Sequence, residues 1–206
     1  MKLYKRLSAL ALTLILSLSL AVPALAVSDS QTLSAQTAAQ AASTLGGAVS
    51  VQYALWQDGE IVLTGHTGTF SKTENRVLMD SDLYGIGSVS KIYTTVAVMQ
   101  LAEDGKLSLD APVTRYLKDF KMADPRYRDI TVRMLLNHSS GLMGSTFDSA
   151  LLFDDSDPSA TDQLLERLST QRLKADPGAY SVYCNDGFTL AELVVESVSG
   201  MDFMDY

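Results

Sequence analysis

The sequence predicts an α+β fold in which a strand hairpin is followed by a mostly helical block. Two β-rich runs within residues 48–70 flank Asp58-Gly59, a strong two-residue turn signal. From Ser88 onward, apolar residues recur at the three- and four-residue spacings of helices. Because two strands alone are marginally stable, we expect the hairpin to need further strands or a helix, and we expect the fold to be incomplete at its C-terminal end.

The first 26 residues are predicted to be a secretory signal peptide. The basic start MKLYKR precedes the uncharged run LSALALTLILSLSLAV, and Ala24 and Ala26 form an A-x-A cleavage pattern. The alternative is an uncleaved membrane anchor, but the run is barely long enough to span a bilayer and Pro23 interrupts its end. We therefore expect cleavage after Ala26, a secreted or extracytoplasmic (cell-envelope) protein, and no stable membrane span.

Composition excludes several classes of partner. Without residues 1–26, the chain keeps 13 of its 16 basic residues and all 24 acidic ones, a net charge of −11. Such a chain is a poor candidate for binding nucleic acid or anionic lipid. Cys184 is the only cysteine, so the chain can form no internal disulfide. The hydrophobic fraction of 47% against 19% charged residues suits a globular core.

The elements follow in order. Residues 27–47 are small and polar, which predicts a spacer or a loosely held first helix, and residues 71–82 form a polar loop after the hairpin. The helix that begins near Ser88 is expected to end at Gly105. Its helical spacing rests on apolar residues near one face: Ile92, Val96, Val98, Met99 and Leu101.

The remaining chain is predicted to be helical and rich in loops. Short helices are expected within residues 112–120 and 130–142, the second with Thr131 as its N-cap. Residues 176–188 form a loop, and a helix over 189–199 closes at Gly200, after which a new helix starts. Residues 159–173 form an amphipathic helix whose inward leucines are Leu164, Leu165, Leu168 and Leu173.

Ser88 and Lys91 are candidates for nucleophilic chemistry. At positions i and i+3 their side chains share one helix face, where a base can take the serine proton. A lysine acts as a base only if burial or nearby positive charge lowers its pKa, and free N–H groups at a helix start can stabilise an oxyanion. The alternative is an ordinary serine cap, because S-x-x-K also occurs by chance.

Tyr183 and Asn185 form the second candidate pair. In an extended segment, residues i and i+2 point the same way, so both side chains could face one cleft. A phenol there can relay a proton, and a carboxamide can bind a substrate amide or orient a lysine. The alternative is a core tyrosine with a satisfied hydroxyl and an asparagine in a turn.

S-x-x-K followed by Y-x-N resembles the serine β-lactamase and penicillin-binding protein superfamily, most closely its class C-like branch of secreted serine hydrolases. Three blocks carry the resemblance in the family's order: residues 82–117, DPRYRDITVRMLLNHSSGL and PGAYSVYCNDGFTLAELVVESVSG. The resemblance implies a β-lactamase/transpeptidase-like fold, an antiparallel sheet flanked by helices plus a helical subdomain. Residues 48–206 would be its N-terminal portion.

The resemblance also implies roles for the four residues. Ser88 would be the acylated nucleophile, with its backbone N–H as half of the oxyanion hole. Lys91 would accept the serine proton or tune the site, and Tyr183 would be the partner base that later activates water. Asn185 would bind the substrate amide. His138 is similar to a histidine that is structural in the family, so it is not counted as catalytic.

Two departures from the family pattern stand out. Cys184 occupies a position where the family usually has serine, and we expect a small buried side chain pointing away from Tyr183. The family's third motif, Lys-Thr-Gly or His-Thr-Gly, follows Tyr-x-Asn, and the chain ends at Tyr206 before it. An H-T-G does occur at residues 66–68, but it precedes Ser88 in the hairpin and is rejected as the third motif.

The sequence therefore predicts a secreted serine acyl hydrolase, or the front part of one. Its substrate would be a β-lactam, a D-alanyl peptide of the cell wall or an ester. The alternative is a truncated or degenerate, non-catalytic cell-envelope protein that binds peptides. A Ser-His-Asp hydrolase is disfavoured, because His66 and His138 are the only histidines and no G-x-S-x-G elbow occurs. The sequence also has no metal-ligand cluster and no nucleotide-binding glycine pattern, so we expect no cofactor and no metal.

Overall fold

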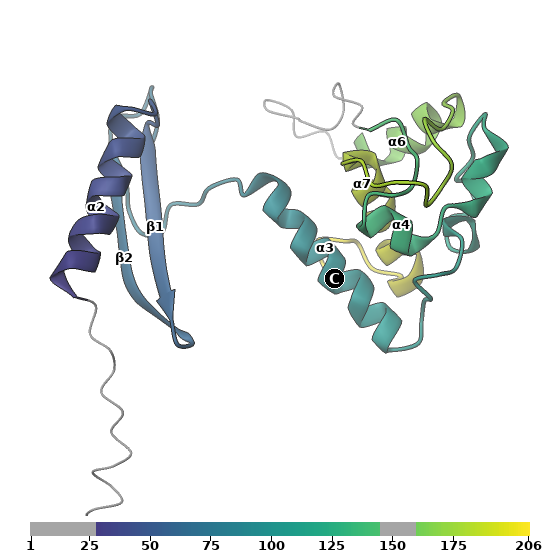
Figure 1. The fold of residues 1–206 in the computed structure, drawn as a ribbon, viewed down its shortest axis with the longest axis horizontal. Coiled ribbons are helices and arrows are strands. Elements are labelled where there is room, and N and C mark those ends of the chain that lie inside the picture. Colours follow the sequence, from purple (N-terminus) through teal and green to yellow (C-terminus); the bar gives the residue numbers. More distant parts are fainter. Residues whose placement is uncertain (1–27, 145–159) are drawn as a thin grey trace, which may run out of the picture. The chain divides into compact units, whose positions relative to one another are not determined.

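A computed structural model describes residues 28–144 and 160–206, and the predicted signal peptide lies outside them. The described residues belong to two compact units, with the boundary between Tyr84 and Gly85 (Figure 1). The first unit holds a helix and the hairpin. The second unit is helical and carries all four candidate site residues.

In the first unit, helix α2 (Asp29–Thr44) packs along the hairpin (Figure 1). Of the two possibilities for residues 27–47, the structure therefore has the helix. A capping box starts it, since the Ser28 hydroxyl accepts from the Gln31 N–H and the Gln31 side chain accepts from the Ser28 N–H. Ala39 is the buried residue of this helix.

The hairpin confirms the prediction from Asp58-Gly59. Strands β1 (Ser50–Gln57) and β2 (Glu60–Gly68) pair antiparallel, and Gln57 lies opposite Glu60. Asp58 and Gly59 have φ angles of 51° and 94°, the positive values that a type I′ turn requires at both central positions. A register shift between Leu55 and Trp56 accommodates one extra residue in β2.

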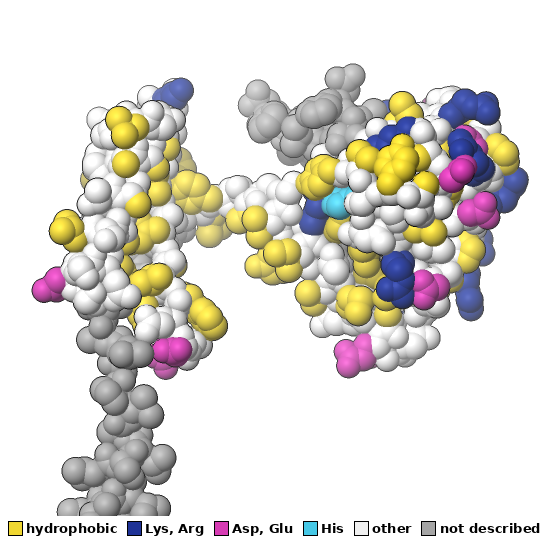
Figure 2. Space-filling model, in the orientation of Figure 1, with side chains coloured by type: hydrophobic (Ala, Val, Ile, Leu, Met, Phe, Trp, Pro, Cys, Tyr) yellow, Lys and Arg dark blue, Asp and Glu magenta, His cyan; other side chains and the backbone are white. Residues whose placement is uncertain are grey.

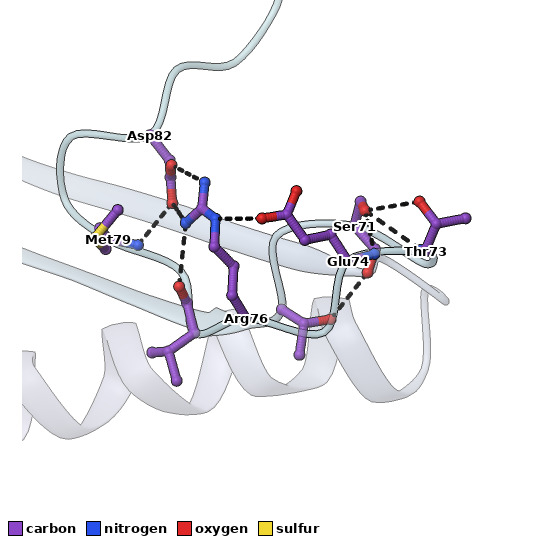
Figure 3. A network of polar contacts seen from close by, with 8 residues as sticks. Ser71, Thr73, Glu74, Arg76, Met79 and Asp82 are labelled. Carbon is purple, nitrogen blue, oxygen red and sulfur yellow. Dashed lines mark hydrogen bonds and ion pairs between the residues drawn. The ribbon is translucent and has the colours of Figure 1, made fainter.

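The polar loop after the hairpin is held by a salt bridge (Figure 3). The Arg76 guanidinium donates to both oxygens of Asp82, at 2.8 and 2.5 Å, and to Glu74 at 3.1 Å. The Met79 N–H also donates to Asp82, at 2.7 Å. Hydrogen bonds from Arg76 and then from Met79 lower the pKa of the Asp82 carboxyl to about 2. Charge-assisted hydrogen bonds therefore help to order the loop, in which Leu78 is also buried.

In the second unit, helix α3 (Ser90–Glu103) starts later than predicted. A 3₁₀ turn, η1 (Gly87–Val89), precedes it, so Ser88 lies in that tighter turn and Lys91 in the first turn of α3. The predicted stop is confirmed: Gly105 has φ 70°, and Lys106 N–H donates to Leu101 across the helix end.

The buried face of α3 corrects the prediction. Thr94, Ala97, Val98 and Leu101 are buried among the described residues. Ile92, Val96 and Met99 of the expected apolar set are instead 63%, 51% and 47% exposed. Hydrophobic side chains are visible along α3 (Figure 2). Because this helix is apolar on both sides, residue spacing alone cannot say which face packs against α7.

The other elements are short, apart from α7. Helix α7 begins at Asn185, four residues before the predicted start at 189, and residues 201–206 after Gly200 form turns rather than the expected new helix. Residues 112–120 contain a 3₁₀ turn in place of the predicted short helix. In chain order these elements are η2 (Val113–Arg115), η3 (Pro125–Asp129), α4 (Val132–Leu136), α6 (Ala160–Ser169) and α7 (Asn185–Ser199).

The core of the second unit surrounds α7, which packs against α3, α4 and α6 (Figure 1). Val98, Leu135 and Val194 have no exposed surface. Two local predictions are confirmed: Thr131 caps α4 by accepting from the Met134 N–H, and the inward leucines after residue 159 are buried, except Leu165, which is half-buried. This core fixes the start of α7 beside the start of α3.

Candidate active site

The structure brings the four predicted site residues into one hydrogen-bonded cluster. Ser88 Oγ lies 2.5 Å from the Tyr183 hydroxyl. Lys91 Nζ donates to Ser88 Oγ at 3.1 Å and to the Asn185 carboxamide oxygen at 2.7 Å. Residues 95 positions apart in the chain therefore meet around one serine.

Two element starts provide this geometry. The 3₁₀ turn places Ser88 three residues before Lys91, so that both side chains lie on one side of the α3 start. Tyr183 lies in the loop before α7, and Asn185 is the first residue of that helix. The extended backbone of Cys184, φ −147° and ψ 113°, explains why its two neighbours point the same way.

The electrostatics favour a reactive phenol. Hydrogen bonding to Lys91 and then to Ser88 lowers the pKa of Tyr183 below its ordinary value. Lys91 Nζ lies 4.9 Å from the centre of the Tyr183 ring. Lys91 donates to Ser88 Oγ, and in the bond between Ser88 and Tyr183 either hydroxyl can be the donor. The Tyr183 side chain is half exposed, so the cluster faces solvent and can meet a substrate.

Phe188 is a site neighbour that sequence analysis missed. Its buried ring lies 5.5 Å from Lys91 Nζ and packs at 5.1 Å against the His138 ring. The sequence predicts a loop at this position, whereas α7 begins at Asn185 and includes Phe188. The one available signal was its position, three residues after Asn185, which is one helical turn.

Segment 137–144 forms a backbone cradle under the Tyr183 loop. Val182 N–H donates to the His138 carbonyl at 2.9 Å, and Gly178 N–H donates to the Ser139 carbonyl at 2.7 Å. Farther along, Lys174 N–H donates to the Gly141 carbonyl at 2.9 Å. These bonds run along most of the loop that precedes α7, so the position of Tyr183 is set by backbone contacts as well as by α7.

A salt bridge between the half-buried Arg126 and the buried Asp124 fixes the beginning of the same loop. Asp124 is 2% exposed and accepts from the Arg126 guanidinium at 2.7 and 3.0 Å and from the Leu173 N–H at 3.2 Å. Arg126 also reaches Asp176. The hydrogen bonds from Arg126 hold the pKa of the Asp124 carboxyl well below its usual range.

Cys184 is buried, as expected. It is 1% exposed, and its thiol donates to the Gly144 carbonyl at 3.1 Å, away from the exposed Tyr183 side chain. Burial raises the pKa of the thiol, which disfavours the thiolate and therefore nucleophilic reactivity.

The H-T-G at residues 66–68 lies in strand β2 of the first unit. There His66 Nδ1 contacts Asp80 at 3.0 Å. Across residues 28–144 and 160–206, no group of three or more His, Cys, Asp or Glu side chains is arranged to hold a metal. The described helices include none that is long and apolar enough to cross a membrane.

Comparison with known proteins assigns the family. A family model described as "Beta-lactamase" matches residues 35–206. A second model, described as a phage related protein, matches residues 1–42, which contain none of the site residues. Penicillin-binding protein 4* of Bacillus subtilis (strain 168) is 30% identical over 155 residues, covering 73% of this chain and 33% of the relative.

An esterase and two solved hydrolases are also similar. Esterase EstB of Burkholderia gladioli is 33% identical, over 66% of this chain and 36% of the esterase. The structure of a D-stereospecific amidohydrolase from Streptomyces sp. matches with a TM-score of 0.66 and 28% identity, over 82% of this chain and 50% of that one. EstCE1, a hydrolase with promiscuous acyltransferase activity, matches with a TM-score of 0.70 and 25% identity, over 82% of this chain and 47% of the EstCE1 chain.

These matches share two features. The chain spans about a third of the length of the curated relatives, 33% of the penicillin-binding protein and 36% of the esterase. Penicillin-binding proteins, esterases and a β-lactamase occur among them, and the similar structures have the serine β-lactamase/transpeptidase fold. With the family model covering residues 35–206, the chain belongs to the β-lactamase family and has its α+β fold.

Proposed function

We propose that the protein is a secreted serine acyl hydrolase that forms an acyl-enzyme on Ser88. The observation that carries the proposal is the position of Ser88 Oγ, 2.5 Å from the Tyr183 hydroxyl and 3.1 Å from Lys91 Nζ. A serine becomes a nucleophile when a neighbouring base takes its proton, and both candidate partners are within hydrogen-bond reach.

In acylation, the Tyr183 phenolate takes the Ser88 proton while Oγ bonds to the carbonyl carbon of the substrate. The negative charge passes to the carbonyl oxygen, for which the Ser88 N–H is one proposed donor. The carbon–nitrogen or carbon–oxygen bond then breaks, and the leaving atom takes the proton from Tyr183. Lys91 stabilises the phenolate, which agrees with the lowered pKa of Tyr183.

In deacylation, Tyr183 removes a proton from water as the water oxygen attacks the acyl carbon. The bond to Ser88 Oγ breaks, and the serine recovers its proton from Tyr183. Asn185 has two roles in this scheme. Its carboxamide oxygen orients Lys91 at 2.7 Å, and its amide group binds the substrate amide.

Three substrate classes fit this chemistry: β-lactams, D-alanyl peptides of the cell wall, and esters. All three offer a carbonyl carbon with a nitrogen or oxygen leaving group. The similarity to a penicillin-binding protein and to an esterase supports the range without choosing within it. Extracytoplasmic localisation is proposed from the basic start, apolar run and A-x-A pattern of residues 1–26.

The test is covalent labelling of the protein as its gene encodes it, with a fluorescent penicillin and a fluorogenic ester. Wild type and three variants are compared: Ser88→Ala, Tyr183→Phe and Ser90→Ala. Ser90 is a matched control, because it is an exposed serine two residues from Ser88 at the start of α3. We expect Ser88→Ala to lose labelling and Ser90→Ala to keep it.

The outcomes separate enzyme from binding protein. Equal labelling of wild type and Ser88→Ala would contradict the proposal. Saturable, non-covalent binding of a D-alanyl peptide without turnover would favour the alternative, a cell-envelope peptide-binding protein. N-terminal sequencing of protein from the culture medium or cell envelope tests secretion, with a start at Val27 expected.

A further inference from the structure

His138 occupies a backbone position that few residues tolerate. Its φ is 62°, in the left-handed region. Asp58 is the other described non-glycine residue with positive φ, and Asp58 lies in a hairpin turn. His138 instead follows α4 in the cradle, immediately after the C-cap residue Asn137. This conformation lets both the carbonyl and the ring of His138 face the Tyr183 loop.

Two hydrogen bonds join His138 to that loop. Its carbonyl accepts from the Val182 N–H at 2.9 Å, and its ring Nδ1 accepts from the Cys184 N–H at 3.2 Å. The bonds lie on either side of Tyr183 in the chain. The His138 ring also packs on the Tyr183 ring, with centroids 4.6 Å apart and planes tilted by 39°.

The bond to Cys184 fixes the protonation state of the ring. The backbone N–H is a donor, so Nδ1 must be the unprotonated nitrogen, and any proton on the neutral ring belongs to Nε2. If Nδ1 were protonated, its N–H would face the Cys184 N–H, and two donors cannot form a hydrogen bond with each other. The Cys184 N–H would then lose its partner, and the ring or the loop would have to move.

We propose that neutral His138 is a positioning residue: its Nδ1 holds the Tyr183–Asn185 segment against the nucleophile, and protonation of the ring releases that segment. The inference rests on the proposed function, because its consequence is a slower acylation of Ser88. The His138 ring packs on Tyr183, which in turn hydrogen-bonds Ser88 Oγ, so His138 acts through Tyr183 and is not a catalytic residue.

The surroundings of the ring favour the neutral form. Burial, and then the positive charge of Lys91, lower the pKa of His138 below 6.5. Phe188 packs on the ring and brings no charge. Asp186 and Lys174 act on Cys184 from α7 and from the preceding loop. The titratable groups that face the ring are Lys91 from α3 and Tyr183 from the loop, and the contact from Cys184 is its backbone N–H.

Two substitutions separate the hydrogen bond from the backbone conformation. His138→Asn keeps a hydrogen-bond acceptor at the δ position, and asparagine also tolerates positive φ. Unlike histidine, the asparagine side chain does not titrate. His138→Gly also tolerates positive φ and has no acceptor. In the whole protein at neutral pH, we expect His138→Gly to slow Ser88 acylation by about 10²-fold, while His138→Asn retains most of the rate.

A spectroscopic measurement tests the same contact without using activity. The chain has two histidines, so ¹⁵N-histidine spectra of wild type and His66→Asn assign both rings. We expect an unprotonated Nδ1 on His138 at neutral pH. As the pH falls, the Cys184 amide and Tyr183 ring signals should shift with the titration of His138 in wild type and not in His138→Asn.

The outcomes are distinct. A protonated Nδ1 at neutral pH, or equal acylation rates for the Gly and Asn variants, would overturn the inference and leave the proposed function standing. If Ser88 is never acylated, the proposed function fails. If the Cys184 and Tyr183 signals still shift with the titration of His138, the inference that His138 positions the Tyr183–Asn185 segment is supported.

Discussion

At the scale of residues, the site depends on Lys91, which interacts with several site residues at once. Its ammonium group contacts Ser88 and Asn185 directly and lowers the pKa of Tyr183 and of His138. One cation therefore favours both the phenolate that takes a proton and the neutral imidazole that holds the loop. In the proposed mechanism Lys91 acts by its charge and its N–H donors, which is the tuning role of the two expected for it.

Tyr183→Phe removes the proposed proton acceptor and keeps the ring. Because general base catalysis contributes about 10²–10⁴-fold, we expect the Ser88 acylation rate to fall within that range. In wild type the rate should rise with pH through the lowered pKa of Tyr183, since only the phenolate accepts a proton. The Phe variant should lose this rise. A stopped-flow pH series of acylation checks it, and an unchanged profile in the variant would assign the base elsewhere.

Lys91→Met keeps the bulk of the side chain and removes its charge. The pKa of Tyr183 should return toward its ordinary value, so any remaining acylation should need a higher pH. The pKa of His138 should rise as well. Lys106→Met is the matched control, because Lys106 is exposed and pairs with Asp104 beyond the end of α3. If the pH profile of acylation moved to higher pH in both variants, the change would not be specific to the loss of the Lys91 charge in the site.

At the scale of elements, the cradle after α4 has a glycine with no room for a side chain. Gly141 has φ 77°, and a Cβ there would lie 2.4 Å from the Ala175 carbonyl oxygen. Gly105 has a similar φ of 70° and open space around it. A substitution at Gly105 therefore introduces backbone strain alone. A substitution at Gly141 introduces the same strain and also displaces the loop that leads to Tyr183.

Gly105→Ala should lower the free energy of unfolding by about 1–2 kcal/mol, the usual cost of a left-handed L-residue, and leave acylation unchanged. Gly141→Ala should cost more and also slow acylation, because the 174–178 part of the loop must move. Urea denaturation and acylation rates measure the two effects. Equal costs and equal rates in the two variants would show that the cradle tolerates displacement.

At the scale of the whole molecule, much of the fold was predictable because its signals are local. The Asp58-Gly59 turn and the Thr131 cap each depend on a few neighbouring residues. Motif spacing offered the four site residues as candidates, the family resemblance assigned them to one site, and the structure brings them together. The buried face of α3 could not be predicted, since the helix is apolar on both sides and only its packing against α7 chooses one.

Other features had no local signal. Helix α7 starts after Cys184, whose side chain makes no capping hydrogen bond, so nothing in the sequence marked Asn185 as its first residue. The 3₁₀ turn at Ser88 was also missed, because Gly87 with φ 51° is recognisable as a turn residue only in the folded chain. Tertiary contacts set both boundaries.

The acidic character of the chain has a consequence for its stability. Burial, and then the charges of Glu196 and Asp202, raise the pKa of Glu192 to about 7. The folded state therefore binds more protons than the unfolded state between the ordinary glutamate pKa of 4.5 and about 7. The free energy of unfolding falls as the pH rises through this window. Above the window, the folded state bears the full cost of ionising Glu192.

Glu192→Gln should remove that penalty. Above pH 7 we expect the variant to be more stable than wild type by about 1 kcal/mol, allowing for partial exposure of the side chain, and below pH 4.5 the difference should vanish. Thermal unfolding across pH measures it, with Glu103→Gln as an exposed control near the end of α3. A stability gain that does not change with pH would contradict the assignment.

The most direct test of the central claim is to locate the acyl group by peptide mass spectrometry after brief reaction with a β-lactam or an activated ester. The tryptic peptide of residues 77–91 contains Ser81, Ser88 and Ser90, so fragmentation must assign the modified residue. The account predicts one acyl group, on Ser88, that forms more slowly in Tyr183→Phe. Acylation of another residue, or an adduct that persists in Ser88→Ala, would contradict it.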